Sequence, residues 1–381
     1  MARFIHAADL HLGRLLHTQR LLEDQEHALD QLRALVASQR PHALLLAGDI
    51  YDRAVPPKEA VALLDAFLSD IVLELEVPVV LIAGNHDSAE RIGFGSRLLQ
   101  SRGLHMVGGL EADPQPLVIQ DEHGPLEVFA LPFLEPARVR ALLDDNEITD
   151  QQSAMAAMVA RVHSVGQHPR RVLVAHAFVD GGLGSDSERP LCVGGAQGVS
   201  AQLFEGFTYT ALGHLHRPQP VGSSTIQYAG SLLKYSLNEI DQPKSFTMVD
   251  IDAAGAATVT RHGFEPLRDL RRIQGTLADL LAVAPQGPPD DWVVATLMDK
   301  GPVFDAMAKL RQHYPNMLHI ERPELEIEHR IRLPGGDHAQ QGIDQLFTTF
   351  FEQVTGEPLS PPESAALEEA LAELLAREVA R

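Results

Sequence analysis

The sequence predicts an α/β protein, with a first domain built on a parallel sheet, then a small α/β unit and a helical tail. In the first hundred residues, apolar runs of strand length alternate with helical stretches, as in βαβ units. Residues 276–333 repeat this alternation on a smaller scale, and beyond them apolar residues recur at helical spacing. The length of 381 residues also indicates two or three domains rather than one.

The first three predicted strands lie at residues 4–8, 43–47 and 77–83. The second of these, Ala-Leu-Leu-Leu-Ala, is apolar throughout, as expected for a strand buried on both faces. A helix is predicted for residues 21–38, and Pro56-Pro57 opens the next one, since proline suits the first helical turn. Each strand ends in polar residues. Because ligands bind beyond the carboxyl ends of strands in open α/β sheets, that edge is the predicted site.

Beyond residue 115 the predicted elements are mixed. Residues 117–119 and 127–131 predict a hairpin. The other expected elements are helices at 136–144 and 150–165 and strands at 172–175, 209–212, 225–228, 246–251 and 257–261. Together these elements give a first domain of residues 1–272.

Residues 273–333 are predicted to form the second domain, with helices at 277–283 and 303–313 and strands at 292–298 and 317–320. Residues 334–381 begin with a Pro-Gly-Gly linker and continue as two amphipathic helices. Their apolar positions are Ile343, Leu346, Phe347, Phe350, Phe351 and Val354 in the first helix, and Leu367, Ala370, Leu371, Leu374, Leu375 and Val379 in the second.

The charge balance limits what the chain does by itself. With 52 acidic and 31 basic residues its net charge is −21, which argues against autonomous binding of nucleic acid. Bound dications, a local basic stripe or a basic partner would offset this charge. The sequence has no apolar stretch of about 18 residues, no signal-peptide pattern and a single cysteine, Cys192. We therefore expect a cytoplasmic protein without membrane spans.

Five short segments with carboxylate, amide or imidazole side chains end predicted strands. They are Asp9-Leu10-His11, Gly48-Asp49-Ile50-Tyr51-Asp52, Gly84-Asn85-His86-Asp87, His176 and Gly213-His214-Leu215-His216. Asp9 and His11 alternate by two, as do His214 and His216, so each pair projects to one side of an extended segment. Each segment alone is explained equally well as a turn, but five in succession, each at a strand end, make accident improbable.

These residue types indicate a metal site. Mixed carboxylate and imidazole ligands suit Mn²⁺, Fe²⁺ or Zn²⁺, and the absence of thiolate disfavours soft metals. The candidate ligands are too many for one tetrahedral ion and suit two ions that share a carboxylate. Two ions about 3.5–4 Å apart can activate water and stabilise an in-line displacement at phosphorus. The sequence therefore predicts a hydrolase of phosphoesters that binds two divalent cations.

In this order the segments resemble the calcineurin-like metallophosphoesterase superfamily and, within it, the SbcD-type nucleases related to those of double-strand-break repair. The more specific matches are residues 9–13, 84–88, 213–219 and 228–231. The resemblance covers nearly the whole chain. Phosphoprotein phosphatases of the superfamily usually carry Glu where this chain has Asp87, although Arg53 after Asp52 is a feature that many of them share.

The resemblance implies a fold and a role for each site residue. The fold is a four-layer β-sandwich flanked by helices, with residues 273–333 as a DNA-facing capping domain. Asp9, His11 and His216 hold one ion, Asn85, His176 and His214 hold the other, and Asp49 bridges the two. His86 contacts the scissile phosphate or the leaving oxygen, and Asp52 orients His86. The expected ions are Mn²⁺.

The implied activity is that of a DNA nuclease in end processing and repair. It degrades duplex ends 3′→5′ and opens hairpins, as a homodimer within a heterotetramer that contains an SbcC-type coiled-coil ATPase. Residues 334–381 are interpreted as the segment that docks on this ATPase, the alternative being that its helices pack on their own domain. Arg14, Arg91, Arg217 and Lys234 are candidate DNA contacts, each equally consistent with ordinary surface charge.

Two other functions stay open. The first is a phosphatase or phosphodiesterase of small phosphate esters, which needs neither the capping domain nor the tail. The second is a non-catalytic scaffold on the same fold. The scaffold is disfavoured because all eight expected site positions, the seven ligands and His86, are present.

Overall fold

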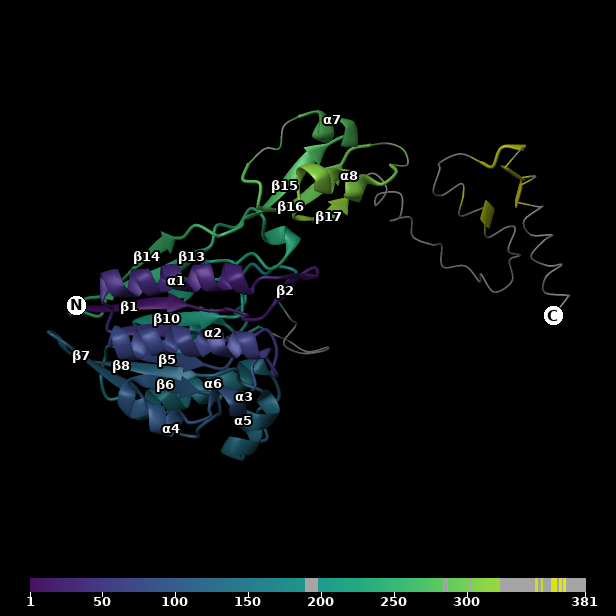
Figure 1. Cartoon of the computed structure of the whole chain (residues 1–381). Helices are drawn as coiled ribbons and strands as arrows, with labels where there is room; N and C mark the ends of the chain where they lie inside the picture. The colour runs from purple at the N-terminus through teal and green to yellow at the C-terminus, as the bar shows by residue number, and fades with distance from the viewer. Residues whose placement is uncertain are drawn as a thin grey trace. The chain divides into compact units, whose positions relative to one another are not determined.

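The computed structural model describes residues 1–188, residues 198–322 apart from 284, 286, 300 and 302, and a few positions between 347 and 367. The chain divides into two compact units, Met1–Leu270 and Arg271–Arg381 (Figure 1). Cys192 and nearly all of the predicted linker and docking helices at 334–381 lie outside the described residues.

The first sheet of the larger unit has the strand order β14-β13-β1-β4-β5-β6. Its strands are β1 (Ala2–Ala7), β4 (Ala43–Leu46), β5 (Val79–Ile82), β6 (Leu104–Val107), β13 (Ser245–Ile251) and β14 (Ala257–Gly263). Strands β1, β4, β5 and β6 are parallel to one another. On the other side of β1, β13 pairs antiparallel with β1, and β14 pairs antiparallel with β13. The predicted parallel arrangement therefore holds for the half of the sheet built from βαβ units.

The second sheet has the order β11-β12-β10-β9-β8-β7. Its strands are β7 (Leu117–Asp121), β8 (Gly124–Leu131), β9 (Arg171–His176), β10 (Tyr209–Gly213), β11 (Gln219–Val221) and β12 (Ser223–Tyr228). The inner strands β8, β9, β10 and β12 are parallel, and the edge strands β7 and β11 are antiparallel to their neighbours. The hairpin predicted near residues 117–131 is the pair β7 and β8.

The two sheets pack face to face. Phe4, Leu45 and Val80 of the first sheet share one apolar core with Val128 and Val174 of the second. Because side chains alternate across a strand, the neighbours of these residues point to the outer faces, where helices cover them. Helices α1 (Leu22–Gln39) and α2 (Lys58–Ser69) lie over the first sheet (Figure 1).

The outer face of the second sheet is covered by α5 (Pro136–Leu143) and α6 (Gln151–Val165). Val139 and Met155 of these helices pack with Phe129 and Leu173 of the sheet. The order of layers is thus helix, sheet, sheet, helix, which confirms the four-layer sandwich. Shorter elements are β2 (Leu15–Leu16), β3 (Gln19–Arg20), a π-helix (Asp70–Glu74), α3 (Ala89–Ile92), α4 (Ser96–Leu99) and 3₁₀ turns at Gln100–Arg102, Ala201–Phe204 and Leu237–Glu239.

The smaller unit has a three-stranded sheet in the order β15-β16-β17. Its elements are β15 (Leu270–Gly275), α7 (Leu277–Ala282), β16 (Trp292–Leu297), α8 (Ala306–His313) and β17 (Met317–Glu321). Val293 of β16 and Met317 of β17 pack against Leu310 of α8 in its core. Among the helices that the structure describes, none has the length and apolar character needed to cross a membrane.

Candidate metal centre

The candidate site lies beyond the carboxyl ends of five strands that come from both sheets. Asp9 and His11 follow β1, Asp49 follows β4, and Asn85 and His86 follow β5 of the first sheet. His176 ends β9, and His214 and His216 follow β10, of the second sheet. The structure therefore brings all seven predicted ligands and His86 together at the edge where the sequence places them.

The loops that carry the ligands adopt a backbone conformation that ordinary residues avoid. Asp9, His11 and Asp49 have φ angles of 52°, 44° and 50°, and His214 has a φ of 111°. Main-chain hydrogen bonds hold two of these loops together: Asp9 N–H donates to Gly48 O at 3.0 Å, and His11 N–H to Asp49 O at 2.9 Å. Strain of this kind costs roughly 1–3 kcal/mol per residue and persists where surrounding contacts impose it, as in functional sites.

Glycines give these loops the room to approach each other. A Cβ on Gly84 would lie 2.2 Å from Asp49 Oδ1, and one on Gly213 would lie 1.9 Å from Ala47 O. A Cβ on Gly48, which has a φ of 88°, would lie 2.4 Å from His176 Nδ1. The loops after β4, β5, β9 and β10 are thus in contact through positions that only glycine can occupy.

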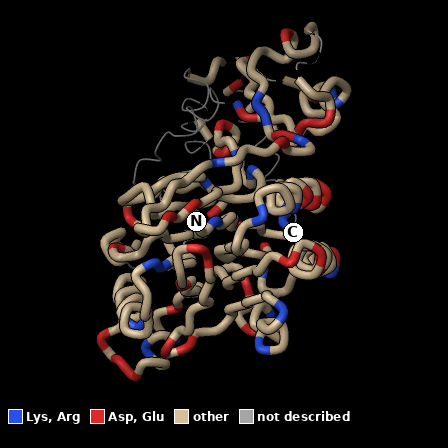
Figure 2. Tube along the Cα trace, turned by 90° about the vertical axis from the view of Figure 1, so that its left-hand side faces the viewer, with Lys and Arg blue, Asp and Glu red and all other residues tan. Residues whose placement is uncertain are grey.

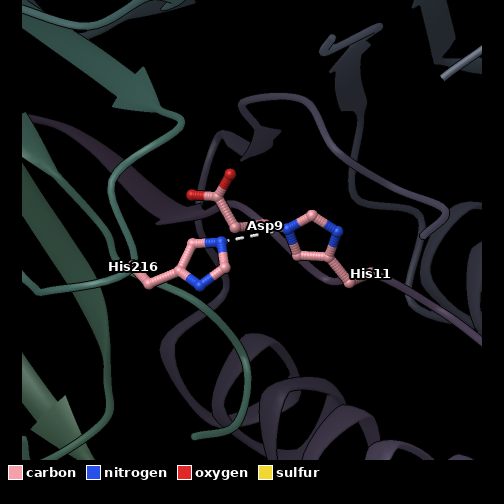
Figure 3. Close-up of side chains that lie close together, drawn as sticks. All are labelled: Asp9, His11 and His216. Atoms are coloured by element: carbon pink, nitrogen blue, oxygen red, sulfur yellow. Dashed lines mark hydrogen bonds between the residues drawn. The ribbon is translucent and has the colours of Figure 1, made fainter. Parts of the chain in front are cut away.

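Asp9, His11 and His216 form the first group of side chains (Figure 3). All three are buried, and His11 Nε2 lies 3.0 Å from His216 Nε2. The Asp9 carboxylate lies beside the two rings in Figure 3 and accepts the His214 N–H, at 2.9 Å for Oδ1 and 3.1 Å for Oδ2.

His176, His214 and Asn85 form the second group. Asn85 Oδ1 lies 2.9 Å from His176 Nε2 and 3.2 Å from His214 Nδ1. On the far side of its ring, His176 Nδ1 is 2.9 Å from Ala47 O. Because a carbonyl only accepts hydrogen bonds, this Nδ1 carries a proton, and Nε2 is the ring nitrogen that faces Asn85 Oδ1.

Asp49 lies between the two groups. Its Oδ2 is 3.7 Å from His11 Nε2 and 3.6 Å from His176 Nε2, so one carboxylate oxygen faces a member of each group. Its Oδ1 accepts the His86 N–H at 2.9 Å, which fixes the orientation of the carboxylate.

This donor set fits divalent cations. Two donors that bind one ion at ~2.1 Å lie roughly 3.0–3.4 Å apart, close to the separations between neighbouring donors here. His176 Nε2 and Asn85 Oδ1 face each other at 2.9 Å, a spacing that suits two ligands of one cation. The ligands are oxygen and imidazole nitrogen, a set that suits Mn²⁺, Fe²⁺ or Zn²⁺.

The local electrostatics point the same way. Burial, and then the charge of Asp49, raises the pKa of Asp9 well above its ordinary value. Burial alone would raise the pKa of Asp49 too, but His176 and His86 hold it below its ordinary value. Burial lowers the pKa of His214 to about 3. His214 therefore stays neutral at neutral pH and keeps the lone pair that a metal ligand requires.

His86 is buried beside these groups, with its ring centroid 4.6 Å from that of His11 and its Nε2 3.9 Å from Asp49 Oδ2. Its Nδ1 donates to the main-chain oxygen of Asp52 at 2.8 Å. Asp52 thus contacts His86 through its backbone. The Asp52 carboxylate instead faces His11 Nδ1 at 3.9 Å and Arg14 at 3.4 Å.

The four candidate DNA contacts fall into two kinds. The guanidinium of Arg14 pairs with Asp52, and Lys234 Nζ pairs with Asp269 at 2.8 Å, so both charges are already engaged. Arg91 and Arg217 are exposed and form no ion pair with another described residue. Figure 2 shows basic and acidic residues interspersed along the described chain.

Several residues support the site in ways that the sequence did not indicate. The Asp87 carboxylate accepts the N–H groups of Gly84, Ile50 and Tyr51, which ties the loop after β5 to the loop after β4. Burial, and then Asp49, raises the pKa of Asp87 to about 7. The position of Asp87 directly after Asn85 and His86 could have indicated this supporting role from the sequence.

Gln25 and Tyr235 support the loop after β1 through hydrogen bonds to its main-chain oxygens. The Gln25 amide donates to His11 O at 2.8 Å, and Tyr235 donates to Leu10 O. Beneath His216 lies a buried group of Ser187, Glu239 and Lys244. None of these five residues belongs to a motif or follows a recognisable spacing, so nothing in the sequence marked them.

Comparison with known proteins gives consistent results. The family described as "Calcineurin-like phosphoesterase" matches residues 2–218, and the one described as "Type 5 capsule protein repressor C-terminal domain" matches residues 266–355. The SbcD subunit of the nuclease SbcCD of Staphylococcus epidermidis is 31% identical over 378 residues, which are 99% of this chain and 100% of that protein. The protein of the same name from Staphylococcus saprophyticus is 32% identical over 375 residues, 98% of each chain. A solved dimetal phosphatase from Danio rerio, 12% identical, covers 69% of this chain and 96% of its own, with a TM-score of 0.38.

Proposed function

The chain belongs to the SbcD family of calcineurin-like phosphoesterases, which are metal-dependent hydrolases, and from this premise we propose that it is a DNA nuclease that uses two Mn²⁺ ions. The observation that carries the proposal is the convergence of seven oxygen and imidazole ligands, with Asp49 between the two groups and His86 beside them. The nuclease assignment, rather than a general phosphoesterase, is supported by the names of the two full-length relatives.

In this proposal Asp9, His11 and His216 hold one ion, and Asn85, His176 and His214 hold the other. Asp49 is shared, because its Oδ2 faces both groups. When bound, the two cations supply positive charge against the phosphate and acidify the attacking water. The chain itself orders these ligands through hydrogen bonds and buries all of them except Asn85, which is partly exposed.

His86 takes the role of proton donor and charge stabiliser. Its Nδ1–H is committed to Asp52 O, so Nε2 is the nitrogen that exchanges a proton with, or donates a hydrogen bond to, the scissile group. Asp52 is the positioning residue, because the main-chain contact fixes the tilt and the tautomer of the ring.

The proposed substrate is DNA, cut 3′→5′ from duplex ends and at hairpins, in the cytoplasm. The proposed assembly is a homodimer within a heterotetramer that includes an SbcC-type coiled-coil ATPase. Residues 273–333 serve as the capping domain and residues 334–381 as the docking segment. A net charge of −21 makes such a partner useful, since a basic surface elsewhere in the complex would attract the DNA backbone.

The test is cleavage of a 3′-labelled DNA hairpin with Mn²⁺, with and without the ATPase partner, by the wild-type protein and by His86→Ala. We expect His86→Ala to lower the cleavage rate about 10²–10⁴-fold, the contribution of a general acid, while the Mn²⁺ content stays unchanged.

His123→Ala is the matched control, because His123 lies in the turn between β7 and β8, away from the site, and should cut at the wild-type rate. Full activity of His86→Ala would remove His86 from the mechanism. Hydrolysis of nucleotide monoesters without cleavage of any DNA would select the small-ester phosphatase instead.

A further inference from the structure

His216 is held from several sides by buried polar groups. Its N–H donates to Glu188 Oε1 at 2.8 Å, and its carbonyl oxygen accepts from Lys244 Nζ at 2.8 Å. Its ring Nδ1 is within hydrogen-bond distance of the Ser187 hydroxyl, and the same Nδ1 lies 3.4 Å from Glu239 Oε1. His216, Ser187, Glu239 and Lys244 are all buried. The backbone and the ring of this one residue are therefore fixed together.

The proton positions in this group follow from the chemistry of its members. Glu239, paired with the ammonium of Lys244 at 2.6 Å, is ionised and only accepts hydrogen bonds. The single hydroxyl proton of Ser187 is donated to Glu239 Oε1. Ser187 Oγ must then accept from His216, so Nδ1 carries the imidazole proton. The chain of hydrogen bonds runs in one direction, from His216 through Ser187 to Glu239.

In the neutral ring, His216 Nε2 is then the nitrogen without a proton, and it faces the site, where it lies 3.0 Å from His11 Nε2. Lys244 supports this arrangement, because its three donors are used by Glu239, His216 O and Ser231 Oγ, at 2.6, 2.8 and 2.9 Å. The Lys244–Glu239 ion pair thus fixes both the Glu239 carboxylate, which accepts the last of these hydrogen bonds, and the backbone of His216.

Two of the other rings are held differently. His176 Nδ1 and His86 Nδ1 donate to main-chain oxygens of Ala47 and Asp52, which no substitution of a side chain removes. In the part of the chain that the structure describes, His216 is the ring whose tautomer is set by a charged side chain acting through a hydroxyl.

We propose that Glu239, acting through Ser187 and anchored by Lys244, is a positioning residue that fixes the Nδ1–H tautomer of His216 and so prepares Nε2 as a metal ligand. A hydrogen bond to the far nitrogen orients a ligating histidine and raises its basicity, and its loss typically costs 10–100-fold in metal affinity. This inference rests on the proposed metal centre but not on the identity of the substrate.

The first measurement is the tautomer of His216 in the metal-free, full-length protein, by long-range ¹H–¹⁵N correlation of the imidazole, assigned by comparison with His216→Asn. We expect an Nδ1–H ring in the wild type. Ser187→Ala removes the relay and should give a mixture of tautomers, whereas Ser187→Thr keeps the hydroxyl and should retain the wild-type signal. Glu239→Gln should also give a mixture, because an amide can accept from Ser187 or donate to it.

The second measurement is calorimetric titration of Mn²⁺ into the same proteins. One of the two binding steps should weaken about 10–100-fold in Ser187→Ala and in Glu239→Gln, with recovery in Ser187→Thr. Asp121→Asn is the control, because it breaks a pair with Arg170 that is equally buried but touches no proposed ligand.

An unchanged tautomer together with unchanged Mn²⁺ affinity in Ser187→Ala would overturn the proposal, even if Glu239→Gln does not fold. Both measurements are made without DNA, so a chain that binds Mn²⁺ but cuts no DNA would refute the proposed nuclease function and leave this inference intact.

Discussion

At the scale of single residues, the site is made of polar and ionisable side chains, which are usually exposed to solvent, but most of them are buried here. Asp9 and Asp49 are buried within one cluster, where burial first and then the charge of Asp49 raise the pKa of Asp9. Such an arrangement is costly unless opposite charge compensates it. Three of the ligand residues also adopt positive φ angles near 50°. Neither feature benefits an isolated fold, so both are most simply explained by cations at this edge of the sheets.

Gly84→Ala tests how closely the ligand loops must approach. The new Cβ would lie 2.2 Å from Asp49 Oδ1 and 2.3 Å from Asp49 N, so the shared carboxylate would have to move. We expect an overpacking cost of about 1–3 kcal/mol in the free energy of unfolding, together with weaker Mn²⁺ binding. Urea denaturation and metal content measure the two effects.

Gly109→Ala provides the control for Gly84→Ala, because a Cβ on Gly109 has no heavy atom within 4 Å. This variant should unfold and bind Mn²⁺ like the wild type. If Gly84→Ala and Gly109→Ala have the same stability and the same Mn²⁺ binding, the loop after β5 can accommodate a Cβ at position 84, and the close approach is not required.

The sequence predicts the proposed ligands but not the residues that would orient them. The ligands carry a signal because their residue types are those of metal sites and their positions end strands. Ser187, Glu239 and Lys244 carry none, since each is an ordinary polar residue and only the folded chain places them beneath His216. The role of Asp52 is partly of this kind, because its contact with His86 uses a main-chain oxygen that any residue possesses.

At the scale of secondary structure, apolar patterning identifies most elements and fails where an element is half exposed. The runs that form β4 and β5 are buried throughout and agree with the predicted strands. The strand β15 (Leu-Arg-Arg-Ile-Gln-Gly) was missed because its two adjacent arginines interrupt the apolar pattern, although Leu270 and Ile273 are buried. The strand β6 was missed for a similar reason, since only Leu104 of its four residues is buried.

Helix α6 begins with a capping box that can be tested by itself. Asp150 accepts the Ser153 N–H at 2.8 Å, and the Ser153 hydroxyl accepts the Asp150 N–H at 3.1 Å. Loss of an N-cap typically costs about 0.5–2 kcal/mol, so Asp150→Ala should lower the free energy of unfolding by that amount at neutral pH. Because Met155 and Met158 of this helix pack into the core, the effect should appear in global unfolding by urea.

The pH dependence of that difference has a definite sign. The N–H and hydroxyl of Ser153 lower the pKa of Asp150 below its ordinary value of 3.8 in the folded protein. A depressed folded pKa means that the contribution is fully present above the unfolded pKa and is lost as the pH falls through the folded value. The gap between wild type and Asp150→Ala should therefore persist from neutral pH down to about 4 and close below it. A gap that widens in acid would contradict this account.

At the scale of the whole molecule, the site exists because two sheets meet at one edge. Asp9 after β1 and His214 after β10 are 205 positions apart, yet the carboxylate of one accepts the N–H of the other. Strand patterns in the sequence predict that both segments are strands but contain no information on which strands lie side by side. The joining of the two sheets was therefore expected only through the resemblance to a family, and the structure supplies its physical basis, a shared apolar core.

The net charge of −21 sets a condition for binding DNA, and the two exposed arginines offer a test of where contact occurs. Arg217 adjoins His216 and has no ion-pair partner among the described residues, whereas Lys234 is already paired with Asp269 at 2.8 Å. In a His86→Ala background, which should cut too slowly to degrade the probe during the measurement, Arg217→Ala should weaken binding to a DNA hairpin. It should also reduce the slope of log K against log salt by about 1, the signature of one lost phosphate contact.

Lys234→Ala in the same background should leave that slope unchanged, because its charge is neutralised within the protein. Fluorescence anisotropy at several salt concentrations measures both variants, and the Mn²⁺ content confirms that His216 is undisturbed. If Lys234→Ala lowers the slope and Arg217→Ala does not, the DNA must displace Asp269 from Lys234. Equal slopes in His86→Ala and in the two double variants would mean that neither residue contacts a phosphate. The phosphate contacts would then come from elsewhere in the complex, as the net charge of −21 would lead one to expect.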